Sequence, residues 1–495
     1  PYVTLVYRPS AATSDQILET VIIPSDTPEG YSIIVGHDEG EGVATQRWLC
    51  PSPTKNAENS DTTNLKKIGP NVGPAYGTKH SATEFGPTAP AKPGEPYTVS
   101  LNVNPVYTAA GTRPGDEILS VTLVYRRDLD DATLGEATMT KTGTDEGGDV
   151  WTGTIPAEAI PVAGHLLQWK TRIVDASSNT WTSPSFMNPD DGYEWFGTIT
   201  EPGELNSAKL PTWHMFIDDA SKAQMDVDAD KQTLANNARV AIYDASTSNY
   251  YDYVRIDLRG NTSQGNGFIK NSHGLRFAKV HPMTMWDCVT GKTVEGRKTS
   301  LVGEFADVSY LRQMTSFWLF NKNGSPCPFH IPVRVNLNGS FYKFAYNSER
   351  MTDELIEDIY GFDKFGYTFK SIGSWGNGAL AGGTEKKTPD DENETDTRVL
   401  KAFTDTLPTK LVESEADHLK YSKIVAEKFD LPAWLNYIAL SRITHETGDT
   451  GANSCGYYDN PDLIEGVRGT GTWRPLGYDQ QQTFGVWSVK TITPV

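Results

Sequence analysis

The sequence predicts a multidomain fold in which two all-β domains precede a mixed α+β domain. Residues 1–202 contain a degenerate repeat of short, alternating apolar runs, which is typical of antiparallel strands. After Gly203 the pattern changes to strands mixed with amphipathic helices. The length of 495 residues also suits two to four domains better than one.

The clearest part of the repeat is the run Val3–Arg8, which recurs letter for letter as Val121–Arg126. Clusters of Gly, Pro, Asp and Ser separate such runs, and two consecutive sandwiches of immunoglobulin-like type fit this spacing best. We assign residues 1–92 to a partial first sandwich with a long loop and linker. Within it, the polar segment 55–96 runs into the second sandwich, residues 93–202.

The first copy lacks an equivalent of the strand expected at Tyr97–Val103 in the second copy. The chain is therefore expected to start inside its first sandwich. Three alternatives account for the missing strands: preceding sequence supplies them, a neighbouring subunit supplies them, or the first copy has a more degenerate fold. An open sheet edge otherwise invites pairing. A neighbour that filled the edge would link copies head to tail into a filament.

Residues 203–495 are expected to form one domain with a sheet lobe and a helical lobe. Asn338-Gly339 predicts a type I′ hairpin turn. The other expected elements are strands at Leu210–Ile217, Tyr253–Leu258 and Gly274–Val280, and helices at Asp307–Phe320, Glu413–Phe429 and Leu431–Thr444.

Charge and composition exclude several classes of partner. A net charge of −19 and a pI near 4.9 argue against nucleic acid and against an anionic membrane surface. No apolar run approaches the 18 residues of a membrane-spanning helix, so no membrane insertion is expected. Many Trp, Tyr, Gly and Pro residues with few Cys are typical of a secreted or cell-surface β-rich protein.

The four cysteines are not spaced as metal ligands. Cys288 and Cys327 lie in one domain and could pair, whereas Cys50 and Cys455 have no obvious partner. Three sequons are candidate glycosylation sites if the source is a secretory eukaryote: Asn261, Asn338 and Asn393.

The acidic run 226–230 resembles the start of an EF-hand calcium loop. Lys231 stands where that loop needs Gly, and Asn237 where it needs the bidentate Glu. Calcium is therefore one alternative for this segment, and a capped helix with a solvated acidic face is the other.

Asp449, Asn453 and Asp479 are the most informative residues for chemistry. Two carboxylates and an amide from two loops are the groups that phosphoryl transfer needs: a base for the attacking hydroxyl and ligands for the magnesium that accompanies ATP. No Ser-His-Asp order, GxSxG, HExxH or Walker sequence occurs, which disfavours hydrolases and P-loop proteins.

Five blocks in the same order resemble the CotH-type (spore coat protein H) kinase family over about residues 205–487. They are Arg255–Phe277, Asp307–Arg312, Val335–Arg350, Trp434–Asn453 and Trp473–Gly485. The resemblance implies a protein-kinase-like α+β fold that uses ATP and Mg²⁺.

The same resemblance implies roles for individual residues. Asp449 would be the catalytic base, and Asn453 and Asp479 the magnesium ligands. Arg259 would begin a glycine-containing turn over the phosphates, although an ordinary polar hairpin loop is the alternative. Lys270 would meet the phosphates and Glu349 would anchor it. The alternatives are a solvated Lys and an exposed Glu.

Two departures from the family pattern leave the activity open. Gln481 stands where the family usually has a second acid before Phe-Gly, and the chain ends at Val495, soon after this loop. One hypothesis is an extracellular kinase acting on Ser or Thr of secreted, coat or matrix proteins. A second is an inactive kinase-like structural component of an extracellular assembly. A third is a carbohydrate- or calcium-binding adhesin.

Overall fold

The structure is a computed structural model that describes the strands within residues 1–80 and most of residues 89–484. Between 89 and 484 it leaves out 106–117, 146–147, 177, 179, 185–193, 207–208, 226–237, 260–270, 279–280, 288–290, 305–306, 308, 351–355, 357–359, 364, 372–383, 390–395, 409–412, 445–453, 465–466 and 479–482. Of the helices in the described part, none has the length and apolar character to cross a membrane.

Residues 2–67 contribute two small antiparallel sheets. β1 (Tyr2–Tyr7) pairs with β2 (Gln16–Ile22). β3 (Ser32–Gly36), β4 (Gln46–Cys50) and β5 (Lys66–Lys67) form a three-stranded sheet. β1 contains most of the run Val3–Arg8, so the strand predicted at the start of the first repeat is confirmed.

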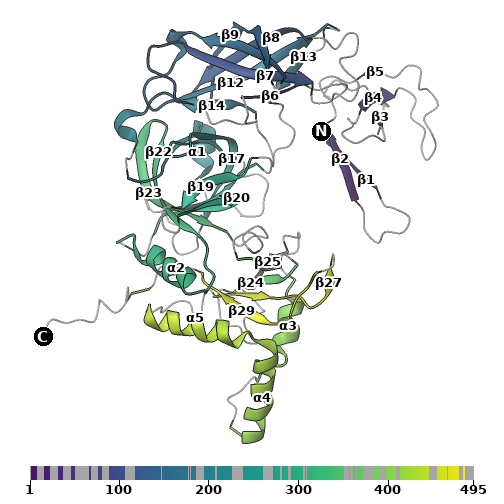
Figure 1. Ribbon diagram of the computed structural model, residues 1–495, viewed down its shortest axis with the longest axis vertical. Coiled ribbons are helices and arrows are strands. Elements are labelled where there is room, and N and C mark those ends of the chain that lie inside the picture. The colour runs from purple at the N-terminus through teal and green to yellow at the C-terminus, as the bar shows by residue number, and fades with distance from the viewer. Residues whose placement is uncertain are drawn as a thin grey trace, which may run out of the picture.

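The next part of the chain is a sandwich of two antiparallel sheets (Figure 1). One sheet contains β6 (Tyr76–Lys79), β7 (Tyr97–Pro105), β11 (Gly148–Ile155) and β10 (Thr140–Asp145), in that order. The other contains β9 (Asp130–Thr138), β8 (Ile118–Arg127) and β12 (Leu166–Asp175), with β13 (Thr180–Ser183) and β14 (Phe196–Ile199) both on the far edge of β12.

Alternating side chains of both sheets fill the sandwich core. Leu101 of β7, Leu123 of β8 and Trp169 of β12 are all buried in one cluster. The expectation that residues 55–96 are only loop and linker is wrong at β6, which pairs with β7. A strand of four residues, Tyr-Gly-Thr-Lys, is too short for hydrophobic alternation to be recognised.

After two short 3₁₀ turns, η1 (Ala157–Ala159) and η2 (Gly203–Leu205), seven described strands close into a barrel. In barrel order they are β15 (Thr212–Phe216), β16 (Arg239–Asp244), β17 (Asn249–Arg259), β18 (Ser272–Arg276), β21 (Lys298–Val302), β23 (Ser340–Glu349) and β22 (His330–Leu337). Helix α1 (Asp219–Met225) and the hairpin of β19 (Met283–Asp287) with β20 (Lys292–Gly296) are further elements of this part.

The barrel closes through a parallel pairing of β15 with β22, whereas the other neighbouring strands are antiparallel. Along β17, Val254 and Ile256 are buried while Arg255 and Asp257 are half-buried, the period-two alternation of a strand with one inner face. A sheet lobe was predicted, but not its closure, because the closing pair joins segments more than a hundred residues apart.

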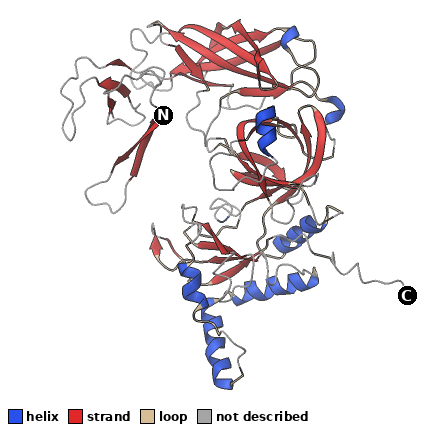
Figure 2. Cartoon of the chain, turned by 180° about the vertical axis from the view of Figure 1, so that it is seen from behind, coloured by secondary structure: helices blue, strands red, loops and turns tan. Residues whose placement is uncertain are grey.

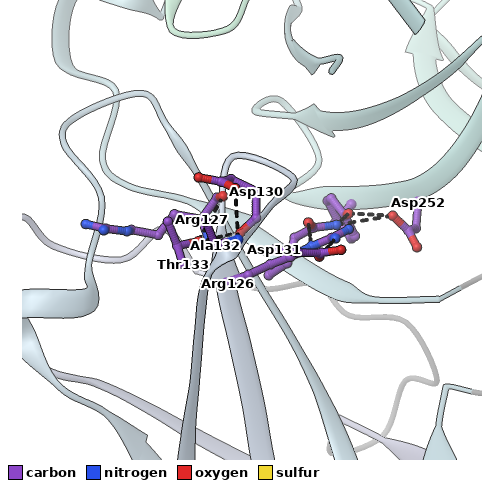
Figure 3. A network of polar contacts seen from close by, with 9 residues as sticks. Arg126, Arg127, Asp130, Asp131, Ala132, Thr133 and Asp252 are labelled. Carbon is purple, nitrogen blue, oxygen red and sulfur yellow. Dashed lines mark hydrogen bonds and ion pairs between the residues drawn. The ribbon is translucent and has the colours of Figure 1, made fainter. Parts of the chain in front are cut away.

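The hydrophobic core of the sandwich extends onto the barrel strands β15, β16 and β17, whereas the barrel interior has a core cluster of its own. Tyr250 of β17 packs in the sandwich cluster, and a Cβ added at Gly197 of β14 would come within 2.7 Å of its ring. Beside it, Asp252 accepts hydrogen bonds from the Tyr250 hydroxyl (2.8 Å), from Gln168 Nε2 of β12 (3.3 Å) and from two backbone N–H groups. Figure 3 shows Asp252 at the end of a polar network that also contains Arg126 and Asp131. The predicted division near residue 203 therefore separates two parts that pack as one body.

Helices gather at the other end of the molecule, around a four-stranded sheet (Figure 2). The sheet order is β25 (Thr384–Thr388), β24 (Tyr367–Ser371), β26 (Ser454–Tyr458) and β29 (Trp473–Leu476). The helices are α2 (Arg312–Lys322), α3 (Arg398–Thr404), α4 (Glu415–Lys428) and α5 (Leu431–Ile443), and a small ribbon joins β27 (Leu463–Ile464) to β28 (Val467–Arg468). We call this part the lower lobe.

The predicted helices at 307–320, 413–429 and 431–444 are confirmed as α2, α4 and α5. α2 begins and ends later than predicted, whereas α4 and α5 lie within the predicted bounds. The hairpin at Asn338-Gly339 is confirmed as well. Both turn residues have positive φ, +48° and +76°, as a type I′ turn requires.

Candidate active site

The lower-lobe sheet has one face covered by helices and one face turned to the barrel (Figure 1). Phe369 and Trp473 pack with Leu400 of α3 on the helical face. On the opposite face, Cys455 and Leu476 lie in register on β26 and β29 and are buried with Ile356. Residues that act between the barrel and the lower lobe must therefore come from this second face or from the ends of its strands.

The predicted catalytic residues belong to segments that connect to two neighbouring strands, β26 and β29, at the same end of this sheet. Cys455 pairs with Leu476, so the start of β26 and the end of β29 are adjacent. Asn453 immediately precedes β26, and Asp479 follows β29 by three residues. The backbone entering β26 and the backbone leaving β29 thus start from neighbouring positions.

The far ends of the same two loops also meet. Thr444, which caps α5, accepts a hydrogen bond at its carbonyl from Phe484 N (2.6 Å). Residue 444 begins the segment that contains Asp449 and Asn453, and residue 484 ends the segment that begins with Asp479. The described residues that flank segments 445–453 and 479–482 are therefore adjacent at both ends.

Helix α2 fixes the second anchor point. Ser316 donates a hydrogen bond to Thr483 (2.7 Å between the hydroxyl oxygens), and neither side chain is exposed to solvent. The segment after α2 supports β29, since Gly477 N donates to Pro326 O (2.8 Å). A Cβ at Gly477 would lie 1.9 Å from Cys327 Sγ, so only glycine fits there.

Most of the predicted site residues lie outside the described part of the chain. They are Lys270, Asp449, Asn453 and Asp479, together with the sequons Asn261 and Asn393 and the acidic run 226–230. Their roles stay predictions. Among the described residues, no group of three or more His, Cys, Asp or Glu side chains is placed to hold a metal ion.

Arg259 is the last residue of β17 and donates a hydrogen bond to Ser300 Oγ of β21. It lies on the outer face of the barrel, where a Cβ at Gly274 would come within 3.0 Å of its Cδ. Burial raises the pKa of Glu385 in the lower lobe, but Lys387, Lys370 and Arg259 lower it by more. Arg259 therefore acts across the junction of the two lobes.

Glu349 ends β23 and is buried. The register places it beside Thr299, and Thr299 lies beside Leu275 of β18. Residue 270 precedes Leu275 by five positions, about 16 Å along an extended strand. The predicted ion pair of Lys270 with Glu349 thus requires the chain before Asn271 to fold back along β18.

The structure also describes two of the cysteines and the sequon at Asn338. Cys327 and Cys455 are buried free cysteines, so the Cys288–Cys327 disulfide that the sequence allowed is not formed. Asn338 lies in the β22–β23 turn, where its side-chain amide bonds the backbone of Ile217 in both directions, each at 3.0 Å. A glycan on Asn338 would have to leave these bonds in place.

A lysine on the sheet face that is turned to the barrel is not predicted from the sequence. Lys370 of β24 lies in register between Glu385 of β25 and Cys455 of β26. Its ammonium is 4.8 Å from the centre of the Tyr478 ring, and Tyr478 is the residue before Asp479. Nothing near Lys370 in the sequence points to this, because its partners come from three other strands or loops.

Part of the chain matches one protein-family model. Residues 256–493 match the family model described as CotH kinase protein. The match begins inside β17 and includes the later barrel strands and the lower lobe, and it supports the CotH-type resemblance of this part of the chain. No curated protein matches the chain.

Two solved structures from Listeria monocytogenes show weak similarity. A cycloalternan-forming enzyme in complex with a pentasaccharide substrate is 9% identical, with a TM-score of 0.15, and the match covers 43% of this chain and 16% of that one. An uncharacterized protein of strain EGD-e is 10% identical, with a TM-score of 0.16, and the match covers 46% and 18%. The match thus spans less than a fifth of either of those chains, and TM-scores this low do not define the fold here.

Proposed function

We propose that the barrel and the lower lobe form a CotH-type protein kinase domain that transfers phosphate from ATP to Ser or Thr of secreted or coat proteins. The observation that carries the proposal is the pair of shared anchors. Segments 445–453 and 479–482 both run from the β26–β29 edge to the contact of Thr444 with Phe484. This arrangement favours convergence of a base and metal ligands, which phosphoryl transfer requires.

The donor set suits magnesium. Asn453 and Asp479 offer an amide and a carboxylate oxygen, the hard ligands that Mg²⁺ prefers when it also binds phosphates. Bound magnesium would neutralise charge on the phosphate oxygens. Asp449 would accept the proton of the attacking hydroxyl, while Arg259 would face the phosphates from the barrel.

The proposal extends to the domain that precedes the kinase-like part. The sheet order β6-β7-β11-β10 corresponds to strands A-B-E-D of an immunoglobulin sandwich. The order β9-β8-β12 with β13 or β14 corresponds to C′-C-F-G. We therefore assign an immunoglobulin-like sandwich, which would present the kinase domain outside the cell.

The decisive experiment compares Asp449→Ala and Asp479→Ala with the unchanged protein in MgATP and a Ser/Thr-containing acceptor. We expect Asp479→Ala to lose both ADP release and calorimetric nucleotide binding, because a metal ligand is gone. Asp449→Ala should still bind nucleotide but release ADP slower by about 10²-fold or more, since a base acts in the reaction step.

Asp405→Ala is the matched control, because Asp405 is an exposed carboxylate of the same lobe that pairs only with Lys401 among the ion pairs described. It should behave like the unchanged protein. Equal ADP release by all four proteins would remove both predicted residues from the mechanism.

The second candidate is an inactive kinase-like component of an extracellular assembly, in which copies of the chain contact one another or coat proteins. Gln481 favours it, since the position where the family usually has an acid carries no charge. This candidate predicts no ADP release from the unchanged protein at any acceptor concentration, with its fold and thermal unfolding intact.

A further inference from the structure

Helix α5 is apolar on the side that faces solvent as well as on the side that is buried. Its buried residues are Tyr437, Leu440 and Ser441. The exposed residues follow the helical period and lie together on the other side of the helix. Six of these seven are apolar, and they are Leu431, Pro432, Leu435, Ile438, Ala439 and Ile443, with Arg442 as the seventh. A helix that is apolar on every side is normally buried, so we expect the outer face of α5 to be covered.

The exposure of this outer face is large where it matters most. Leu435, near the middle of α5, is 66% exposed, and Ile443 at its end is 69% exposed. Between them Ile438 is 46% exposed. Side chains of this size gain free energy when they leave water, which gives the face an affinity for another apolar surface.

Helix α4 presents a second uncovered surface next to the first. It projects from the lower lobe beyond α5 in both views (Figures 1 and 2). None of its 14 residues is buried, and Leu419 is 61% exposed. Isolated helices of this length are only marginally stable in water. Two residues, Phe429 and Asp430, join α4 to α5, so one partner can cover both helices.

The charges at the two ends of this surface are opposite. Arg442 follows Leu435 by seven residues, and Glu427 precedes Leu435 by eight. Both are exposed. In an antiparallel pair of α5 helices centred on Leu435, each Arg442 would lie near the partner's Glu427. The surface is therefore complementary to a second copy of itself across a two-fold axis.

The size of the surface also favours a second copy over a short peptide. Stable interfaces bury roughly 800 Å² on each partner and use about 20–30 residues a side. α5 has seven exposed residues, which falls short of that size, but α4 adds eleven more. A peptide that covered α5 alone would leave α4 without a partner, whereas a copy of the chain brings two helices of its own.

We propose that the outer faces of α5 and α4 form the interface of a symmetric dimer of this chain, with antiparallel α5 helices that meet at Leu435. Such an interface uses the same surface on both copies and is complete after two. It thus differs from the head-to-tail filament expected from the first repeat, in which each contact leaves another open. The dimer does not depend on the proposed kinase activity.

Sedimentation velocity of the full chain over a range of about 0.1–100 μM tests the proposal, and we expect a monomer–dimer equilibrium. Leu435→Glu should weaken dimerisation by about 100-fold or more, because it brings two carboxylates together in an apolar interface. Leu134→Glu is the matched control. Leu134 is a 49% exposed leucine on β9 of the sandwich, and its variant should dimerise as the unchanged chain does.

A charge exchange tests the predicted geometry and keeps the experiment decisive if Leu435→Glu fails to fold. Arg442→Glu and Glu427→Arg should each weaken the dimer severalfold, and the variant with both changes should regain most of the lost affinity. Loss of affinity without this recovery would overturn the antiparallel arrangement.

Three further outcomes would overturn the dimer itself. One is an unchanged chain that stays monomeric at every concentration. Another is a dimer or larger species that Leu435→Glu leaves intact. The third is a monomer whose Tm falls in Leu435→Glu but not in Leu134→Glu, which would assign the cover of α5 to another segment of the same chain.

Discussion

The side-chain amide of Asn338 acts in place of a strand neighbour at one corner of the barrel. It accepts from Ile217 N and donates to Ile217 O, the two groups that a paired strand would satisfy just beyond β15. Its backbone meanwhile adopts the positive φ of the turn. One residue thus forms the β22–β23 hairpin and also ties that hairpin to the barrel seam between β15 and β22.

His214 is buried at the same seam and should make stability depend on pH. Burial and the charge of Arg334 lower the pKa of His214 from 6.5 to about 4, and its Nε2 lies 2.8 Å from Asn206 Oδ1. The unfolded chain therefore binds this proton more readily than the folded one. The contribution of His214 is complete above pH 6.5 and is lost as the pH falls toward 4.

At pH 5 the loss from His214 should be about 2 kcal/mol relative to pH 7.5. His214→Gln keeps a hydrogen-bond donor for Asn206 but cannot titrate, so it should flatten the pH dependence of the unfolding free energy by about that amount. Chemical denaturation at both pH values measures it.

Helix α2 joins the barrel to the lower lobe. Phe317 contacts His330 of the barrel edge-on, with ring centres 5.5 Å apart. Phe320 contacts Tyr437 of α5 in the same way, also at 5.5 Å. Ser316, the residue before Phe317, donates a hydrogen bond to Thr483. The buried residues of α2 therefore contact the barrel, α5 and Thr483, which directly follows the segment that begins with Asp479.

The bond between Ser316 and Thr483 should couple α2 to that loop. A double-mutant cycle of Ser316→Ala and Thr483→Val should give a coupling free energy of about 1 kcal/mol in unfolding. If the kinase proposal holds, each single variant should also lower kcat more than it changes nucleotide affinity, because the displaced loop carries Asp479.

Thr315→Ala is the matched control for this cycle. Thr315 is the neighbouring hydroxyl on α2 and bonds only the carbonyl of Leu311 within its own helix. It should show no coupling to Thr483. Additive effects of Ser316→Ala and Thr483→Val would mean that the bond does not tie the helix to the loop.

Local pattern explains which elements the sequence could predict. α4 and α5 begin at side-chain caps, Ser414 and Asp430, and the Asn-Gly turn is specified by its two residues. The order of the loops along the chain likewise indicated the candidate site. By contrast, the charge group around Lys370 and the closing pair β15–β22 depend on residues far apart in sequence, which periodicity cannot bring together.

At the scale of the whole molecule, the sandwich packs directly against the barrel. Trp195 at the junction lies between two cations of the sandwich, Arg126 at 4.2 Å and Lys170 at 4.0 Å from its ring centre. The backbone N–H groups of Glu194 and Trp195 donate to Asp252 of the barrel, each at 2.8 Å. Burial raises the pKa of Asp252, so its ionised form depends on these donors.

We therefore expect sandwich and barrel to unfold in one calorimetric transition, and Asp252→Asn to lower it. Asparagine presents one acceptor oxygen and an NH₂ group to a site built entirely of donors, which leaves buried donors unsatisfied. A loss of about 2–3 kcal/mol corresponds to a fall in Tm of roughly 5–10 °C for a unit of this size. Glu136→Gln, which removes an exposed ion pair with Arg172 in the same sandwich, should change Tm by little. Two separate transitions in the unchanged protein, one for each part, would show that the shared core does not join them into a cooperative unit.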